Sequence, residues 1–392
     1  MQLNRPVYLD YNATTPLDPA VVEAMMPFFR ESFGNPSSGT HSYGWDAKIA
    51  VENARTAAAR MIGAIDVHSI IWTSGATESN NLAIQGILNP FIAKNERAHF
   101  ITTQTEHKAV LDVARYLERH HEKNGLEVTY IKPDSYGQVS AESVCSAIRP
   151  HTRLISIIHA NNEIGTVNPV AAIAAEVRKK NIMLHVDAAQ SAGKIPLDVE
   201  KYGIDLLSVS GHKIYGPKGV GFLYAHPSVL KSGRLSPLFF GGSQEHGLRP
   251  GTLNVAGIVG LGRACELCYS TMPSESARLC QMRDKFIAEV LQSVPSVQLN
   301  GHPTERVYSN ISLSFKGLSS DVFASLGVSQ IAVSSGSACS TGEPSHVLAA
   351  IGLPEDLARA TLRIGIGRFT TPQDLDVAIA QIQVLARHLE NV

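Results

Sequence analysis

The sequence has few cysteines and no excess of charge of either sign. Five cysteines are scattered along 392 residues, a small and odd number that excludes a secreted disulfide framework and favours a reducing compartment. The 34 basic and 35 acidic residues give a formal net charge of −1, so the excess of positive charge that direct nucleic-acid binding requires is missing. A small-molecule ligand is the better first hypothesis.

Long apolar runs are missing as well. No run approaches the roughly 18 residues of a membrane span, and the N-terminus lacks the charged and apolar regions of a secretory signal. We therefore expect a cytoplasmic protein that does not bind membranes. With 44% hydrophobic and 18% charged residues, the composition is globular, and the length favours two or three domains at about 150 residues each.

From about residue 47 to 225, apolar strand-like runs alternate with helix-like segments, which predicts an α/β fold with a mainly parallel sheet. Strands are expected at 69–74, 98–104, 127–133, 152–160, 182–189, 206–211 and 220–225. Helices are expected at 47–63, 107–125, 169–181, 274–293 and 372–390, and short strands near 306–315 and 330–334. We expect an N-terminal arm (1–15), a large domain (16–262) and a smaller α+β domain (263–392).

Ligands of open α/β sheets bind at the carboxyl ends of the strands, and unusual residues follow several of the expected strands. After the strand at 69–74, Gly75, Ala76 and Thr77 turn into the start of a helix. Free backbone N–H groups and a hydroxyl at that point suit a phosphate group. An ordinary Thr-capped helix gives the same pattern, so this stretch alone leaves both interpretations open.

Asp187 lies near the end of the strand expected at 182–189. Its side chain is on the same face as that of His185, because side chains alternate along a strand. A buried carboxylate needs a positive partner. That partner is either a metal held with His185 or the protonated ring nitrogen of a cofactor. A third interpretation is a structural aspartate that caps the next turn.

Lys213 follows the next strand, in the sequence Ser210-Gly211-His212-Lys213. A lysine beside a histidine at a strand end is explained if Lys213 holds a carbonyl cofactor as a Schiff base, for which the amine must be sheltered and deprotonated. A solvated surface lysine is one alternative. The serine β-lactamase string Ser-x-x-Lys is another, but no Ser-Asp-Asn element follows it.

Cys339 lies in a run of small and hydroxylated residues between Gly336 and Gly342, which predicts an exposed loop. An exposed thiol in a reducing compartment is explained if it reacts. An incidental loop cysteine is the alternative. Cys265 and Cys268 lie in an apolar helical stretch without a second CxxC motif, so we expect them to pack in the core.

Six motifs together resemble those of the pyridoxal-phosphate-dependent cysteine desulfurases, and the similarity extends from residue 8 to residue 369. In chain order they are SGATESNN (74–81), QTEH (104–107), NNEIG (161–165), HVDAAQ (185–190), SGHK (210–213) and SSGSAC (334–339). The last motif is similar to the branch that includes the iron–sulfur-cluster and nitrogenase-associated enzymes. The resemblance implies a fold-type I transferase whose large domain binds pyridoxal 5′-phosphate (PLP) and whose small domain carries the cysteine loop.

The resemblance also implies roles for individual residues. The catalytic residues would be Cys339, Lys213 and His107, with His107 stacked on the cofactor ring. Asp187 would pair with the ring nitrogen and Gln190 with the ring oxygen. The cofactor-binding residues would be Ala76, Thr77, His107, Asn162, Asp187, Gln190, Ser210, His212, Lys213 and, from the other subunit of a homodimer, Thr252. The substrate-binding residues would be Asn35, Asn162 and Arg363. No metal is implied.

The activity that this resemblance implies is the conversion of L-cysteine to L-alanine with formation of a persulfide on Cys339. Sulfur-acceptor proteins would take the sulfur for iron–sulfur cluster assembly, tRNA thiolation or DNA phosphorothioation. The alternatives are a selenocysteine lyase or aminotransferase on the same fold, and a catalytically silent scaffold that binds sulfur acceptors. Only three residues separate Cys339 from Glu343, a shorter spacer than the resemblance implies, which bears on the choice of acceptor.

Overall fold

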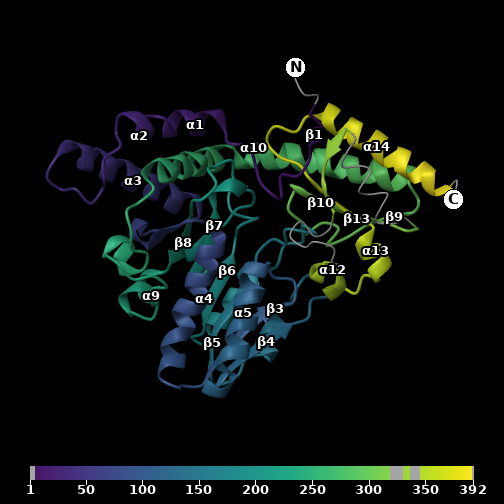
Figure 1. The fold of residues 1–392 in the computed structure, drawn as a ribbon. Coiled ribbons are helices and arrows are strands. Elements are labelled where there is room, and N and C mark those ends of the chain that lie inside the picture. Colours follow the sequence, from purple (N-terminus) through teal and green to yellow (C-terminus); the bar gives the residue numbers. More distant parts are fainter. Residues whose placement is uncertain (1–4, 318–329, 336–344, 391–392) are drawn as a thin grey trace.

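The computed structural model describes residues 5–317, 330–335 and 345–390. The start of the expected N-terminal arm and the expected catalytic Cys339 lie outside the described residues. Figure 1 shows two packed bodies, and one long helix, α10, that runs along both.

The larger body is built on a seven-stranded sheet in the order β2-β8-β7-β6-β5-β3-β4. Its strands are β2 (Ile70–Thr73), β3 (Ala98–Thr103), β4 (Leu126–Ile131), β5 (Thr152–Ile158), β6 (Met183–Asp187), β7 (Leu206–Ser210) and β8 (Gly221–Ala225). Only β8 runs antiparallel to its neighbours. The expected seven strands and the mainly parallel sheet are therefore confirmed, with boundaries that differ by one or two residues.

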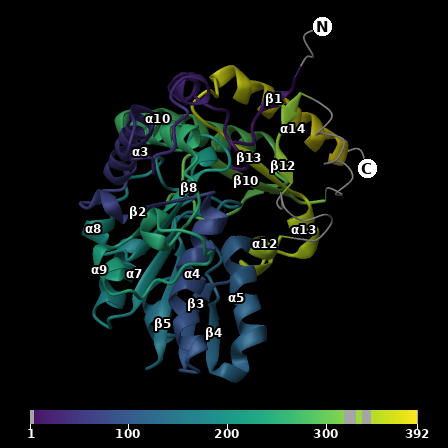
Figure 2. The same cartoon turned by 60° about the vertical axis from the view of Figure 1, so that its left-hand side comes forward.

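Alternate side chains of the sheet enter two separate hydrophobic cores. In β6, for example, Leu184 and Val186 enter one core and Met183 the other. The first core is covered by α3 (Ser42–Met61) and α7 (Val170–Arg178), and the second by α4 (Ala76–Ala93) and α5 (Lys108–His121), which lie side by side in Figure 2. Strands buried on both faces explain the near-continuous apolar runs in the sequence.

Shorter helices connect these elements. They are α1 (Pro19–Met25), α2 (Pro27–Arg30), α6 (Ala141–Ser146), α8 (Val199–Tyr202) and α9 (Pro227–Lys231), with the 3-10 turns η1 (Val67–Ser69), η2 (Glu122–Asn124), η3 (Gly211–Lys213) and η4 (Gln244–Gly247).

Helix α10 (Val255–Ser293) is 39 residues long and belongs to both bodies. Cys265 and Cys268 near its start pack into the larger body, as expected, whereas Phe286 and Val290 near its end pack into the smaller one. The sequence predicted a helix at 274–293, which begins just after Pro273. The helix instead continues through it, because packing along its length offsets a proline cost of about 3 kcal/mol. The boundary expected between residues 262 and 263 lies inside this helix.

The smaller body contains a four-stranded antiparallel sheet in the order β12-β13-β10-β9. Its elements are β9 (Val297–Leu299), β10 (Asn310–Phe315), β12 (Ser334–Ser335), β13 (Thr361–Gly365), α12 (His346–Ala350), α13 (Glu355–Arg359) and α14 (Pro372–Glu390). Strands β9 and β13 are not among the strands expected from the sequence.

The N-terminal segment of the chain lies in the smaller body. Strand β1 (Val7–Tyr8) pairs in parallel with β11 (Ile331–Ala332), and the next residue, Leu9, is fully buried in the smaller hydrophobic core. The chain then crosses to the larger body, where Val21 of α1 is buried. Within the described residues, no helix has the length and apolar character needed to cross a membrane.

Candidate active site

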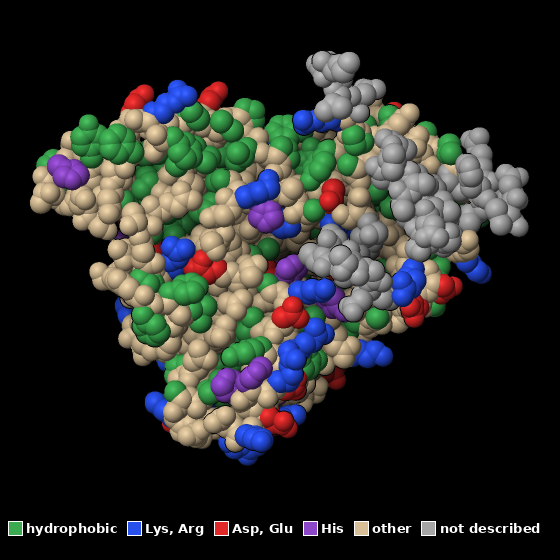
Figure 3. Space-filling view, in the orientation of Figure 1, with side chains coloured by type: hydrophobic (Ala, Val, Ile, Leu, Met, Phe, Trp, Pro, Cys, Tyr) green, Lys and Arg blue, Asp and Glu red, His purple; other side chains and the backbone are tan. Residues whose placement is uncertain are grey.

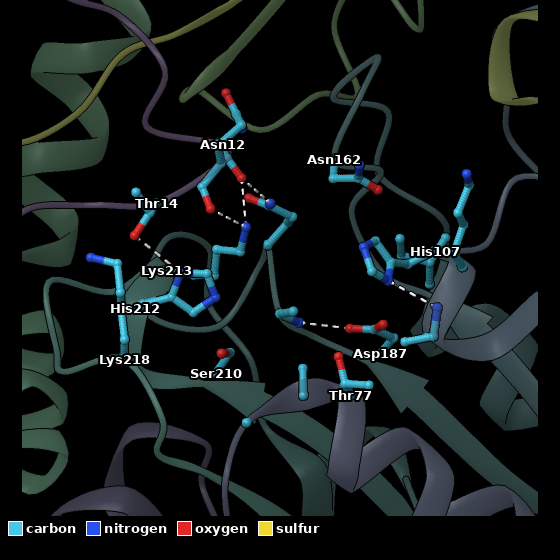
Figure 4. Close-up of a pocket in the computed structure, with 18 of the residues that line it drawn as sticks. Asn12, Thr14, Thr77, His107, Asn162, Asp187, Ser210, His212, Lys213 and Lys218 are labelled. Atoms are coloured by element: carbon cyan, nitrogen blue, oxygen red, sulfur yellow. Dashed lines mark hydrogen bonds between the residues drawn. The ribbon is translucent and has the colours of Figure 1, made fainter. Parts of the chain in front are cut away.

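A cavity of about 540 Å³ opens between the two bodies, at the carboxyl ends of β6 and β7. Ten of the residues singled out in the sequence line it, and those labelled in Figure 4, such as Thr77, Asp187 and Lys213, face a common space. The ten residues are Ala76, Thr77, His107, Asn162, Asp187, Gln190, Ser210, His212, Lys213 and Arg363. The structure thus brings together side chains that are up to 287 residues apart in the sequence.

One end of the cavity is built to receive an anion. Helix α4 begins here after Gly75, whose φ of 147° few other residues adopt. A Cβ on Gly221 of β8 would lie only 2.6 Å from the Gly75 Cα, so glycine lets the two backbones meet closely. The helix N-terminus and the Thr77 and Ser210 hydroxyls then face the same space. Hydroxyls and free N–H groups at a helix N-terminus suit a phosphate group.

His212 is next to this end of the cavity and is uncharged. Its Nδ1 lies 3.1 Å from the Thr14 hydroxyl. Burial, together with the positive charges of Lys213 and Lys218, lowers the pKa of His212 to about 4. At neutral pH its imidazole is therefore a hydrogen-bonding group and does not add positive charge.

Asp187 lies in the middle of the cavity with both carboxylate oxygens held. Asn80 Nδ2 donates to one at 2.8 Å and the Ala189 N–H to the other at 2.9 Å. His185 does not line the cavity. Its two ring nitrogens lie 2.8 and 2.9 Å from the hydroxyls of Ser156 and Ser208, which leaves neither for a metal. The metal interpretation therefore has no support in this site, whereas a fixed buried carboxylate suits a protonated ring nitrogen.

Lys213 extends into the cavity from the turn after β7. Its Nζ donates to the carbonyl oxygens of Asn12 and Ala13, each at 2.7 Å. Both acceptors belong to the N-terminal segment, for whose residues the sequence predicted no role in the site. An amine at this position, sheltered and hydrogen-bonded, is able to react with a carbonyl group.

His107 caps the N-terminus of α5. Its Nδ1 accepts a hydrogen bond from the Ala109 N–H at 3.1 Å, so the neutral ring carries its proton on Nε2. Burial lowers the pKa of His107, and the nearby Lys213 contributes in the same direction, against an opposing effect of Asp187. The ring is thus uncharged at neutral pH and able to take up a proton.

Arg363 of β13 forms the wall that the smaller body contributes. It is 2% exposed, and its Nη2 contacts Asp10 Oδ1 at 3.0 Å and the Ser334 hydroxyl at 3.1 Å. Its Nη1 donates to the Asn162 carbonyl at 3.3 Å, while Nε is buried without a partner among the described residues. The guanidinium is therefore oriented and still has a free donor for a ligand carboxylate.

Several cavity residues were not found by sequence reasoning. Asn12, Thr14, Lys218, Glu163 and His346 all line the cavity. Burial raises the pKa of Glu163 to about 7, although the Ser345 hydroxyl donates a hydrogen bond to it. Glu163 could have been predicted, because it is the carboxylate of the NNEIG motif. Asn12 and Thr14 could not, because they reach the site only through the long-range pairing of β1 with β11.

Two expected site residues lie elsewhere. Thr252 and Asn35 do not line the cavity of their own chain, and Asn35 instead accepts a hydrogen bond from the Ser37 N–H. Their assigned roles stay predictions, as does that of Cys339 outside the described residues.

The site fits PLP by its donor set: an anion cradle at one end, a fixed carboxylate in the middle and a lysine amine between them. Comparisons with known proteins agree. The aminotransferase class-V family model matches residues 7–377. Cysteine desulfurase IscS of Rickettsia felis is 47% identical over 96% of this chain and 90% of that protein.

Two solved structures are similar along nearly the whole chain. A NifS-like protein is 35% identical, with a TM-score of 0.89 over 98% of this chain and all of the other. SspA in complex with cysteine is 39% identical, with a TM-score of 0.80 over 93% of this chain and 99% of the other.

Proposed function

The chain belongs to the cysteine desulfurases of the aminotransferase class-V family, and from this premise we propose that it moves the sulfur of L-cysteine onto Cys339 and releases L-alanine. The cofactor of this family is PLP. The observation that carries the proposal is the arrangement of Lys213, Asp187 and Arg363 around one cavity.

Different residues of the cavity would hold different parts of PLP. Ala76, Thr77, Ser210 and His212 would hold the phosphate of PLP, because backbone and hydroxyl donors converge there. Lys213 would hold the aldehyde carbon and Asp187 the ring nitrogen. Bound PLP supplies an aldehyde that joins the substrate amine and a ring that accepts electrons from the α-carbon.

The chain's own groups perform the remaining steps. Arg363 binds the α-carboxylate of cysteine, which fixes the orientation of the substrate. The Lys213 amine, once free, takes the α-proton. The Cys339 thiolate then attacks the substrate sulfur: an S–S bond forms, the C–S bond breaks, and its electron pair remains with the substrate and is neutralised by a proton in alanine.

The Cys339 thiol must lose its proton before it attacks. A free cysteine has a pKa of about 8.5, so a nearby base favours the thiolate at neutral pH. His107 suits this task because burial keeps its imidazole neutral at the cavity wall. Uptake of a proton at Nδ1 would require release of the Ala109 N–H.

A homodimer with shared active sites is part of the proposal. Large apolar side chains are exposed around α1, α2 and the start of α3, where Figure 3 shows hydrophobic groups gathered. Phe33 is 67% exposed and Phe240, in the segment before Thr252, is 88% exposed. Pairing of this face with a second copy would bury these side chains and bring the Thr252 hydroxyl to the phosphate of the partner's site.

The acceptors we propose are sulfur-accepting proteins in the cytoplasm, in cluster assembly, tRNA thiolation or DNA phosphorothioation. An aminotransferase on the same fold would not need Cys339, and a silent scaffold would not need Lys213; a selenocysteine lyase is distinguished by the Cys339→Ser experiment below. Both residues are present in the sequence.

The proposal is tested by comparing Lys213→Ala with Cys339→Ser. Lys213→Ala should lose the visible absorbance of bound PLP and all turnover. Cys339→Ser should keep that absorbance and its response to cysteine, yet form almost no alanine in a single turnover, because only the thiol accepts sulfur.

Two results would overturn these assignments. The first is borohydride trapping of PLP on a different lysine. The second is near-normal alanine formation by Cys339→Ser, which would move the protein toward a lyase.

A further inference from the structure

Lys194 is a buried lysine to which the mechanism above gives no task. It lies in the turn after β6 and is 4% exposed, and its Nζ donates to Gln190 Oε1 at 3.0 Å. A buried ammonium group is costly unless it is paired. Burial lowers the pKa of Lys194 to about 7, with Lys213 acting in the same direction and Cys268 and Glu275 opposing it.

The Gln190 amide connects Lys194 to the cavity. Its Nε2 donates to the Asn12 carbonyl at 2.9 Å, and that same oxygen accepts from Lys213 Nζ at 2.7 Å. Gln190 itself is 4% exposed and lines the cavity. A chain of hydrogen bonds therefore runs from Lys194 through Gln190 and Asn12 to Lys213.

These hydrogen bonds determine whether the oxygen or the NH₂ group of the Gln190 amide faces the cavity. The two ends of a glutamine amide have nearly the same shape, so only their partners distinguish oxygen from nitrogen. Lys194 offers donors, and the Asn12 carbonyl only accepts. The Gln190 oxygen is therefore held toward Lys194, which leaves the NH₂ group toward the cavity.

We propose that Lys194 is a positioning residue that fixes the Gln190 amide so that its NH₂ group is presented to the ring oxygen of PLP. The inference rests on the proposed function, which places that oxygen beside Gln190. Without Lys194 only the Asn12 carbonyl selects the orientation of the amide. The amide then turns more readily to present its own oxygen, which would repel the ring oxygen instead of donating to it.

The test compares the holoenzymes of Lys194→Met, Gln190→Ala and the double variant. Methionine keeps the length and bulk of lysine but has no donor. We expect Lys194→Met to lose PLP to a scavenging apoenzyme about tenfold faster, the size of one lost hydrogen bond. It should also shift the pH midpoint of the cofactor absorbance in the same direction as Gln190→Ala. The double variant should match Gln190→Ala in both measurements, because Lys194 acts only through that amide.

A conservative variant and a packing control separate positioning from structural support. Lys194→Gln keeps a donor and should recover part of both effects. Cys268→Ala disturbs the same packing layer, since the Cys268 sulfur lies 3.0 Å from where a Gly193 Cβ would be. Among the described residues, the hydrogen bonds of the Cys268 sulfur go to the Ile214 carbonyl and Arg368 and not to Gln190. Cys268→Ala should therefore lower thermal stability without moving the absorbance midpoint.

Two results would overturn the inference, and they differ from each other. If Gln190→Ala changes both measurements while Lys194→Met matches the wild type, Lys194 does not position the amide. If Gln190→Ala also matches the wild type, the assignment of Gln190 within the proposed function fails and this inference fails with it. Lys194→Leu, which also lacks a donor, serves the same comparison if Lys194→Met does not fold.

Discussion

Arg363 is oriented before any substrate binds. Asp10 and Ser334 hold one of its terminal nitrogens, and the Asn162 carbonyl holds the other. A side chain that is already fixed loses little rotamer entropy on binding, so more of the interaction with a carboxylate appears as affinity. The N-terminal segment contributes to substrate binding in this indirect way, through Asp10.

Glu106, next to His107, makes stability depend on pH. It is fully buried, and burial raises its pKa to about 8, against hydrogen bonds from the Ile158 N–H and the Thr103 hydroxyl. A carboxyl group with a raised pKa in the folded state stabilises the fold fully below its unfolded pKa of about 4.5. That contribution is lost as the pH rises toward 8.

Glu106→Gln should therefore become more stable relative to the wild type as the pH rises from 5 to 8. The difference in the free energy of unfolding between the two proteins changes by at most about 1.4 kcal/mol for each pH unit. Glutamine keeps an acceptor but does not titrate. Urea unfolding at several pH values measures the difference. Glu127→Gln is the control. Arg97 and the other positive neighbours of Glu127 lower its pKa to about 2, so its contribution changes only in more acidic solution. Parallel stability curves for Glu106→Gln and the wild type would contradict the prediction.

At the scale of elements, one buried ion pair holds an unusual turn against the sheet. Arg55 of α3 contacts both carboxylate oxygens of Glu245 at 2.8 and 3.0 Å, and Glu245 also accepts from the Trp72 N–H of β2. Glu245 and His246 have φ of 47° and 59°, in the left-handed region that non-glycine residues rarely adopt. The ion pair therefore maintains a backbone shape that local preferences oppose.

Glu245→Gln should destabilise the protein by about 3 to 5 kcal/mol, because it leaves the buried Arg55 charge with only the more exposed Glu52 carboxylate as a partner. Asp112→Asn, which removes the exposed pair with Arg115, should cost less than about 1 kcal/mol. Thermal and urea unfolding of both variants measure the contrast. The double replacement of Arg55 and Glu245 by methionine should recover part of the loss. Equal stabilities for Glu245→Gln and Asp112→Asn would show that the pair does not hold the turn.

The elements that could be predicted from sequence are those whose pattern is local. The seven strands of the large sheet were found because burial on both faces gives each a continuous apolar run. Strand β13 was missed because polar Thr361 and Arg363 interrupt its pattern, and Arg363 is buried through partners far along the chain. The continuation of α10 through Pro273 could not be predicted, because the packing that offsets the proline is not local in the sequence.

In the candidate site, too, only residues with a local sequence pattern could be predicted. Residues after strands, such as Asp187 and Lys213, could be predicted because strand ends converge at one edge of a parallel sheet. The Asn12 carbonyl could not, since its position depends on the pairing of β1 with β11. Lys194 gave no signal, because only the folded turn shows that it contacts Gln190.

At the scale of the whole molecule, the proposed homodimer predicts complementation. Lys213→Ala and Thr252→Ala should each be inactive alone. In a mixed dimer with shared sites, one of the two sites combines an intact Lys213 with an intact Thr252 from the partner. Activity should therefore return when the two variants are mixed under conditions that exchange subunits, and assays before and after exchange measure it.

Mass spectrometry of the mixture provides the control, because it shows whether mixed dimers have formed. Thr252→Ala should also retain PLP less firmly while remaining dimeric, since a lost charged hydrogen bond costs roughly 1.5 to 3 kcal/mol. If mixed dimers are present and no activity returns, each site is complete within one chain.

The pairing of β1 with β11 has a consequence for how the protein is made. Val7 and Tyr8 pair with Ile331 and Ala332, and Leu9 packs into a core that α14 completes. During synthesis at about 5 to 20 residues per second, the first strand waits on the order of 16 to 65 s for its partner to be made. The larger body has all of its sheet by residue 225 and can form during that interval. The smaller one must close last, and the cavity between them takes shape only after the partner of the first strand has been made.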